Sequence, residues 1–343
     1  MKRFALGSLA VAAFALAAAS ASAQNVKITP LGSHAGELCD RDRATIFEDP
    51  TGVRILYDVG GTVTGGDDAR LGDIHVVLLS HAHGDHMGDR KMKALEAGTC
   101  DRPETISAAP NSTIAEVAAA KNSAIDMINP MANFVGKKVE AINKKPVAAC
   151  PQTGPDIVVP LAAPCLAGVN LGGMRAFKTS AATRSVEITT VVAVHDSTVS
   201  RDLVTDPEKT NLANDGASLM LGQSSGYVIK FTNGLKIYLS GDTALHSEMK
   251  AIVNEFHRAN LAMFNLGVSA VTGESAAYAI NEYLKPNTVI VTHVNEGATA
   301  GGKVKPGTKT AEFIGLVKGR PVYPALSGKT MAFDGDAKCV SGC

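Results

Sequence analysis

Side chains that bind metal ions are crowded into one short segment of the chain, His81-Ala82-His83-Gly84-Asp85-His86. Three imidazoles and one carboxylate within six residues supply the nitrogen and oxygen ligands that zinc-like ions prefer. On a turn, His81 and His83 can bind one ion while Asp85 and His86 bind a second. The alternative is a solvated His-rich turn, but Gly84 stands where the backbone must come close to the ions. The segment therefore predicts a site for two metal ions.

Three more residues of ligand type, His195, Asp242 and His293, follow later in the chain, each close behind an apolar, strand-like run. Taken singly, each has an ordinary explanation. A lone His195 or His293 is more often a core histidine, and Asp242 can simply cap the helix that follows it. Their joint occurrence, in order and each at a strand end, favours metal binding.

This pattern resembles the metallo-β-lactamase superfamily, whose hallmark is H-x-H-x-D-H after a buried strand. The resemblance implies an α/β fold, namely a four-layer αββα sandwich, and a hydrolase with a binuclear metal centre. It implies that His195 completes the ligands of the first ion, that Asp242 bridges both ions, and that His293 completes the second. The implied metal ligands are His81, His83, Asp85, His86, His195, Asp242 and His293.

Two adjacent dications would lower the pKa of a shared water, so that a bridging hydroxide exists at neutral pH, and would polarise the group under attack. Asp85 is the predicted catalytic residue, because it would hold both an ion and the proton of that water. The expected cofactors are two divalent ions, Zn²⁺ first, although Mn²⁺ and Fe²⁺ accept the same ligands. Redox enzymes of the superfamily usually replace the second histidine by an acid, so His83 argues against iron-based redox chemistry.

The setting of Asp242, Ser240-Gly241-Asp242-Thr243, resembles one branch of the superfamily. That branch holds ribonuclease Z, arylsulfatases, lactonases and phosphodiesterases, whereas exported β-lactamases generally lack a bridging aspartate in this setting. The resemblance thus implies cleavage of an ester-type bond, in an aryl sulfate, a phosphodiester or a lactone, within a small-molecule substrate. Two alternatives stay open: a β-lactamase acting on β-lactam antibiotics, and a non-catalytic metal-binding protein on the same scaffold.

Three residues outside this set are candidates for substrate contact, and each has a simpler explanation. His34 also fits a structural or surface histidine, His246 a partly exposed helix residue, and Asn295 a Gly-rich turn. Asp58, at the end of a predicted strand, is a candidate to orient a ligand histidine, as metal-bound histidines usually require. Its alternative is a turn aspartate before Gly60.

The elements that must position these residues are apolar strands that end at them. Proline and glycine in 50–52 predict a first hairpin, and Asn233-Gly234 is a strong signal for a second. A short buried strand leads directly into His81, and another ends at His293. The predicted strands cover residues 45–49, 53–59, 74–80, 186–194, 226–232, 235–240 and 287–292.

Helical spacing of apolar residues predicts helices between these strands. They cover residues 113 to about 124, with a capping box formed by Thr113 and Glu116, as well as 245–256, 275–284 and 310–318. Hairpins and helices alternate in both halves of the chain, which predicts two similar α/β halves with their sheets packed together. Residues 129–176 carry six prolines and two cysteines, and are interpreted as an inserted loop region held by a disulfide.

Composition excludes several classes of protein. The 343 residues include 33 Lys and Arg against 33 Asp and Glu, and 45% are hydrophobic. This content excludes a disordered or fibrous chain. A chain without excess positive charge lacks the electrostatic footprint of a nucleic-acid-binding protein, so no nucleic-acid partner is expected, and the oligomeric state is left open.

Residues 1–23 have the pattern of a secretory signal peptide: Lys2 and Arg3, an uncharged apolar run over 4–19, and the small residues Ala21-Ser22-Ala23. A membrane anchor is the alternative, but the run is short for a span. We therefore expect residues 24–343 to form a single domain that is periplasmic or secreted and free of the membrane after cleavage.

The six cysteines are interpreted as disulfides, because an exported protein meets an oxidising environment. Cys150 with Cys165, and Cys339 with Cys343, are candidate pairs only because they are near each other in the chain. The sequence does not choose among the pairings, and free thiols are the alternative.

Overall fold

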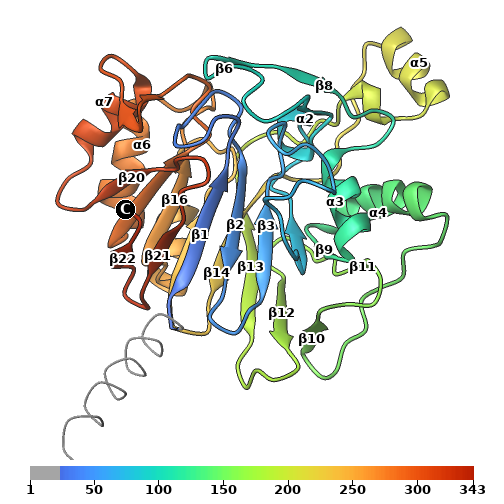
Figure 1. The fold of residues 1–343 in the computed structure, drawn as a ribbon, viewed down its shortest axis with the longest axis horizontal. Helices are drawn as coiled ribbons and strands as arrows, with labels where there is room; N and C mark the ends of the chain where they lie inside the picture. The colour runs from blue at the N-terminus through green and yellow to red at the C-terminus, as the bar shows by residue number, and fades with distance from the viewer. Residues whose placement is uncertain (1–23) are drawn as a thin grey trace, which may run out of the picture.

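Two eight-stranded sheets form the centre of the structure, a computed structural model that describes residues 24–343 (Figure 1). The predicted signal peptide, residues 1–23, lies outside the described residues. In spatial order, the first sheet consists of β11 (Cys165–Leu166), β9 (Ala124–Asp126), β4 (Val76–Leu78), β3 (Arg54–Tyr57), β2 (Ala44–Glu48), β1 (Val26–Leu31), β21 (Met331–Phe333) and β22 (Cys339–Ser341). The second consists of β10 (Asp156–Val159), β12 (Met174–Thr179), β13 (Val186–Val192), β14 (Ser225–Lys230), β15 (Lys236–Leu239), β16 (Leu261–Asn265), β17 (Thr288–Thr292) and β20 (Val322–Pro324).

Helices and small ribbons complete the architecture. The α-helices are α2 (Gly84–Met87), α3 (Thr113–Lys121), α4 (Asn129–Asn143), α5 (Asp206–Asn214), α6 (Gly273–Tyr278) and α7 (Lys309–Leu316). A 3₁₀ turn, η1 (Arg201–Leu203), and two π-helices, η2 (Met249–His257) and η3 (Ala279–Leu284), accompany them. The two-stranded ribbons pair β5 (Arg90–Met92) with β8 (Thr105–Ser107), β6 (Gly98–Thr99) with β7 (Arg102–Pro103), and β18 (Thr299–Ala300) with β19 (Lys303–Val304).

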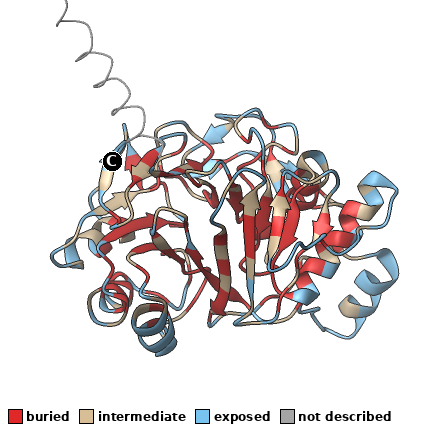
Figure 2. Ribbon diagram, turned by 90° about the horizontal axis from the view of Figure 1, so that it is seen from below, coloured by how far each residue is buried: buried red, intermediate tan, exposed pale blue. Residues whose placement is uncertain are grey.

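The main core lies between the two sheets. Phe47 of β2 lies 6.3 Å from Phe231, just beyond β14, measured between ring centroids, and Tyr57 of β3 packs edge-on against Tyr227 of β14. Figure 2 shows the buried residues concentrated in these central strands and the exposed ones in the outer helices and loops. Burial of such large apolar side chains is the main source of stability in a fold of this kind.

Helices cover the outer faces of both sheets. Helix α3 contacts β4 and α4 contacts β9 and β11 in the first sheet, whereas Phe313 of α7 stacks on Phe264 of β16 in the second. The predicted four-layer αββα sandwich is therefore confirmed. Among residues 24–343, no helix is long and apolar enough to cross a membrane.

Both predicted hairpins are present. β2 pairs antiparallel with β3, and β14 with β15, where Gly234 adopts φ 99° in the turn. The strand predicted over 74–80 is shorter, since β4 covers only Val76–Leu78 and the residues after it do not continue the hydrogen bonding of the sheet. The backbone N–H of Ser80 donates to the side chain of Asp58 instead of to a neighbouring strand.

Two expectations about local structure, for residues 129–176 and for the helix that begins at residue 113, were only partly right. Residues 129–176 are not a loop throughout: α4 begins with Pro130 in its first turn, where a missing N–H costs nothing. The helix predicted from residue 113 exists, but the capping box is wrong. Ser112 is the N-cap, it makes no side-chain cap, and Glu116 pairs with Lys91 at 2.8 Å.

The predicted helix over 245–256 begins later and is a π-helix, η2. Met249 and Val253 are buried, as expected for the face toward the sheet, but Leu245 and Ile252 are exposed and Phe256 is 73% exposed. The prediction assumed 3.6 residues per turn, and the wider π turn moves the later apolar positions off the buried face. The helices predicted over 275–284 and 310–318 are found, the first as α6 continuing into η3.

All six cysteines form disulfides: Cys39 with Cys100, Cys150 with Cys165, and Cys339 with Cys343. Free thiols, the alternative to disulfides, are absent from the described residues. The bridge from Cys39 to Cys100 spans the largest separation and had no local signal in the sequence.

Candidate metal centre

The seven predicted ligands lie together at one edge of the two sheets, where several strands end. Two residues separate β4 from the turn 81–86, and the end of this turn belongs to α2, in the upper half of the view in Figure 1. His195, Asp242 and His293 come just after β13, β15 and β17. Their ligand atoms fall into three converging groups, within each of which the atoms lie within 4.8 Å of one another.

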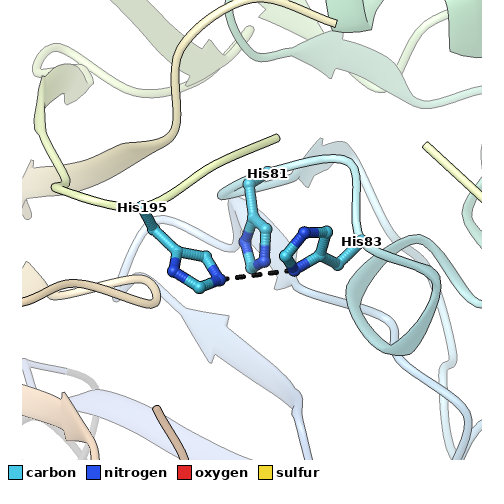
Figure 3. A group of neighbouring side chains, drawn as sticks. All are labelled: His81, His83 and His195. Atoms are coloured by element: carbon cyan, nitrogen blue, oxygen red, sulfur yellow. Dashed lines mark hydrogen bonds between the residues drawn. The ribbon is translucent and has the colours of Figure 1, made fainter. Parts of the chain in front are cut away.

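The first group is formed by His81, His83 and His195 (Figure 3). The Nε2 atom of His195 lies 3.3 Å from Nδ1 of His83, and the ring centroid of His81 lies 4.5 Å from that of His83 and 5.0 Å from that of His195. The three rings point toward one another from two separate segments of the chain. Three imidazoles in this arrangement are a donor set that suits zinc.

The second group is formed by Asp85, His86 and His293. The Nε2 atoms of His86 and His293 are 3.0 Å apart, and Oδ2 of Asp85 lies 3.8 Å from the first and 3.6 Å from the second. Both rings are buried. Two nitrogens and one carboxylate oxygen therefore converge on one point.

The third group is formed by His81, His86 and Asp242, so that Asp242 lies between the other two groups. Its Oδ1 is 3.3 Å from Nε2 of His293, and its Oδ2 is 3.4 Å from Nε2 of His86 and 3.9 Å from Nε2 of His195. Asn265 on β16 donates to Oδ1 at 3.0 Å and so fixes the carboxylate. A single side chain thus contacts both sets of histidines.

The protonation states of these groups fit a cation. Burial lowers the pKa of His81, His195 and His293, so these rings are neutral at pH 7 and can offer lone pairs. The Nε2 atom of His81 is buried and has no hydrogen-bond partner among residues 24–343. A buried acceptor without a partner is costly, and a metal ion would satisfy it.

The two carboxylates stay ionised although they are crowded. Burial would raise the pKa of Asp85 and of Asp242, but His86 and His293 outweigh it and hold both pKa values well below the usual range. Burial would also lower the pKa of His86, yet the carboxylates of Asp242, Asp58 and Asp85 hold that pKa well above its usual range. The site therefore has an excess of negative charge that divalent cations can balance.

Asp58, a candidate to orient a ligand histidine, is hydrogen-bonded to the ligand candidate His86. Its Oδ2 accepts a hydrogen bond from Nδ1 of His86 at 2.8 Å, and Ser80 donates to the same carboxylate through both its backbone and its hydroxyl. A cation that replaced the Nε2 proton of His86 would leave Nδ1 protonated toward Asp58 and would take up the lone pair of Nε2, which faces the centre.

We predict that Asp58→Asn weakens metal binding or turnover by about 10- to 100-fold, the usual effect of losing a partner behind a metal ligand. The matched control is Asp49→Asn. Asp49 is equally buried and accepts hydrogen bonds from Thr51 and Thr232, but it lies in the turn at the far end of the β2–β3 hairpin. Zinc titration of both variants should separate them. Equal affinity in Asp58→Asn and Asp49→Asn would show that Asp58 has no such role.

Two supporting residues were not identified from the sequence. Asp196 accepts a hydrogen bond from Nε2 of His83 at 2.7 Å, leaving Nδ1 of His83 toward His195. Although partial burial opposes it, bonds from His83 and Thr198 lower the pKa of Asp196 to about 2. The available signal was its place directly after His195. Arg43 is the other, and it donates to Oδ2 of Asp85 at 3.1 Å; its position before β2 carried no local signal.

The three substrate-contact candidates lie outside the converging groups. His34 is half-buried and lies 3.0 Å from the hydroxyl of Ser33. His246 has both ring nitrogens buried without a hydrogen-bond partner in the described part of the chain, and burial lowers its pKa. The amide of Asn295 is engaged at both ends, by Arg43 and by the carbonyl of Gly267, so its geometry favours positioning over substrate contact. For His34 and His246, substrate contact stays a prediction.

The chain is similar to known proteins over most of its length. A family model described as a β-lactamase superfamily domain matches residues 42–293, a range that contains Arg43 and all seven ligand candidates. A UPF0173 metal-dependent hydrolase of Polynucleobacter asymbioticus is 27% identical over 299 residues, covering 83% of this chain and 81% of the relative. Another, of Staphylococcus carnosus, is 23% identical over 254 residues, covering 73% and 82%.

Solved structures show the same fold. Igni18, a metallo hydrolase from the hyperthermophilic archaeon Ignicoccus hospitalis, superposes with a TM-score of 0.53 at 20% identity, covering 90% of this chain and 99% of that one. At this identity the likeness concerns the fold alone.

Proposed function

The chain belongs to the metallo-β-lactamase superfamily and is a metal-dependent hydrolase, and from this premise we propose that it is an exported enzyme that cleaves an ester-type bond at a centre of two divalent ions. One observation carries the proposal. Asp242 contacts both groups of ligand atoms, His81, His83 and His195 on one side and Asp85, His86 and His293 on the other. A carboxylate in that place suits a bridging ligand.

The residues would divide the work as follows. His81, His83 and His195 would hold one ion, Asp85, His86 and His293 the second, and Asp242 both. The ions, preferably Zn²⁺, would supply Lewis acidity and lower the pKa of water at the site. Asp85 is about one third exposed, so its carboxylate can reach the open side and accept the proton that the attacking water loses. Asp58, Asp196 and Ser80 keep the ligand rings in place.

The proposed substrate is a small molecule with an aryl sulfate, phosphodiester or lactone bond. The sequence around Asp242 supports this branch, and Asp242 is buried between the ligand groups. We expect zinc-loaded protein to hydrolyse at least one chromogenic substrate of these three kinds faster than a cephalosporin. Fastest cleavage of the cephalosporin would instead indicate a β-lactamase, and no cleavage of any compound by metal-loaded protein would indicate a non-catalytic metal-binding protein.

Export is supported by the leader pattern of residues 1–23 and by the pairing of all six cysteines. We also propose that residues 24–343 act as one domain, which the shared core between the two sheets supports. Mass spectrometry of protein recovered outside the cytoplasm should find a chain that begins at Gln24. Recovery of the uncleaved chain from the cytoplasm would contradict export.

A further inference from the structure

Arg43 is a buried, charged residue beside the candidate metal centre. Only 2% of the side chain is exposed. Gly60, with φ 55°, makes room for it, because a Cβ added at residue 60 would lie 2.7 Å from Cβ of Arg43 and 3.0 Å from the carbonyl oxygen of Asp85. Burying a guanidinium is costly unless its charge and its donors are satisfied, so the partners of Arg43 indicate what it does.

Those partners are mainly Asp85 and Asn295. Nε and Nη2 of Arg43 donate to the same oxygen of Asp85, Oδ2, at 3.3 and 3.1 Å, and Nη2 also donates to Oδ1 of Asn295. Nη1 donates to the backbone carbonyl of Asp42 at 3.3 Å. Asn295 is itself held by its bond to the carbonyl of Gly267. The guanidinium therefore clamps one oxygen of one carboxylate.

This clamp makes the two oxygens of Asp85 different. Oδ2, the clamped oxygen, is also the one that faces Nε2 of His86 and of His293. Oδ1 accepts no hydrogen bond from the described residues, and the Asp85 side chain is 37% exposed. One oxygen is thus fixed toward the ligand group, and the other is left free of protein partners.

We propose that Arg43, held by Asn295, is a positioning residue that fixes the carboxylate of Asp85, so that Oδ2 serves the second ion and Oδ1 stays available for proton transfer. The inference rests on the proposed function of the same site. A planar guanidinium is suited to this role, because it offers several donors in a rigid fork, whereas a lysine offers a point charge. Arg43 is too buried to contact substrate, so it acts through Asp85.

The test is stepwise zinc titration of metal-free protein, together with kcat and KM of the metal-loaded enzyme. Arg43→Gln should weaken the affinity for the second ion by about 10- to 100-fold and change the affinity for the first ion by no more than about twofold. It should lower kcat by a similar factor with little change in KM, because substrate contacts are intact. Arg43→Lys, which keeps the charge without the fork, should fall between the wild type and Arg43→Gln.

A second variant separates positioning from folding. Asn295→Gly removes the exposed amide that holds Arg43 and keeps the positive φ of 52° that glycine tolerates. Asn295→Gly should weaken the affinity for the second ion as well, but by a smaller factor than Arg43→Gln does.

Arg54→Gln is the matched control, since Arg54 pairs with Glu48 at the opposite end of β3. It should leave the affinities for both ions and kcat unchanged.

Different results would overturn different claims. Wild-type affinity for both ions and wild-type kcat in Arg43→Gln and Asn295→Gly would refute the positioning role and leave the proposed function standing. A raised KM with unchanged kcat would assign Arg43 to substrate binding and also refute it. Failure of the wild-type protein to bind a second ion would refute both the inference and the binuclear centre.

Discussion

Replacing Asp85 by asparagine should lower turnover by about 10³-fold while the fold persists. The amide is a poorer metal ligand than the carboxylate, and it cannot take a proton from water. Asp85 is partly exposed and lies at the start of the short helix α2, so the substitution disturbs little packing. It does leave the buried charge of Arg43 without its carboxylate partner, so the thermal unfolding midpoint should fall while the protein stays folded. The measurement is kcat on a responsive substrate, with the thermal unfolding midpoint recorded for the same sample.

Asp156→Asn is a suitable control for this variant. Asp156 pairs with Lys178 at 2.7 Å and accepts a hydrogen bond from Ser185, on the edge strand β10. Its loss should leave the rate unchanged. A near-normal rate in Asp85→Asn would remove Asp85 from the catalytic role proposed for it.

Asp242→Asn should have an effect of similar size by a different route. Because Asp242 contacts both ligand groups, its loss should weaken the binding of both ions. The metal content after dialysis should then fall from about two ions per chain to one or less. Turnover should fall by about 10³-fold, since both ions are needed for the proposed chemistry. Elemental analysis and kcat of the dialysed protein measure the two effects.

The matched control here is Asp126→Asn. Asp126 is a buried aspartate at the end of β9, its Oδ2 has no hydrogen-bond partner in the described part of the chain, and burial raises its pKa well above the usual range. A protonated carboxyl is close in shape and charge to an amide, so this variant should keep both metal and rate. Retention of two ions and normal turnover by Asp242→Asn would show that Asp242 does not bridge the centre.

The seven ligand candidates could be found from the sequence because their signals are local. His81, His83, Asp85 and His86 lie within six residues, and the other three follow apolar strands that end at the same edge of a sheet. Strand periodicity and the turn residues at 50–52 and 233–234 also predicted the two hairpins that the structure contains. Local signals were therefore enough to predict the two hairpins and the convergence of the seven ligand candidates.

The surrounding residues could not be found in this way, because their roles depend on contacts between distant segments. Arg43 meets Asp85 and Asn295 only after the first and last ligand segments have come together. Residues 129–143 form a helix despite Pro130, since proline disturbs only a helix interior. Likewise, no spacing rule for an α-helix could place Phe256 of the π-helix η2 on the surface.

Metal content tests the binuclear centre most directly. Elemental analysis of the wild-type protein, purified without chelator and dialysed against metal-free buffer, should find close to two ions per chain, with zinc as the main element. Less than about half an ion per chain, in protein whose thermal unfolding shows that it is folded, would contradict a centre built from His81, His83, Asp85, His86, His195, Asp242 and His293.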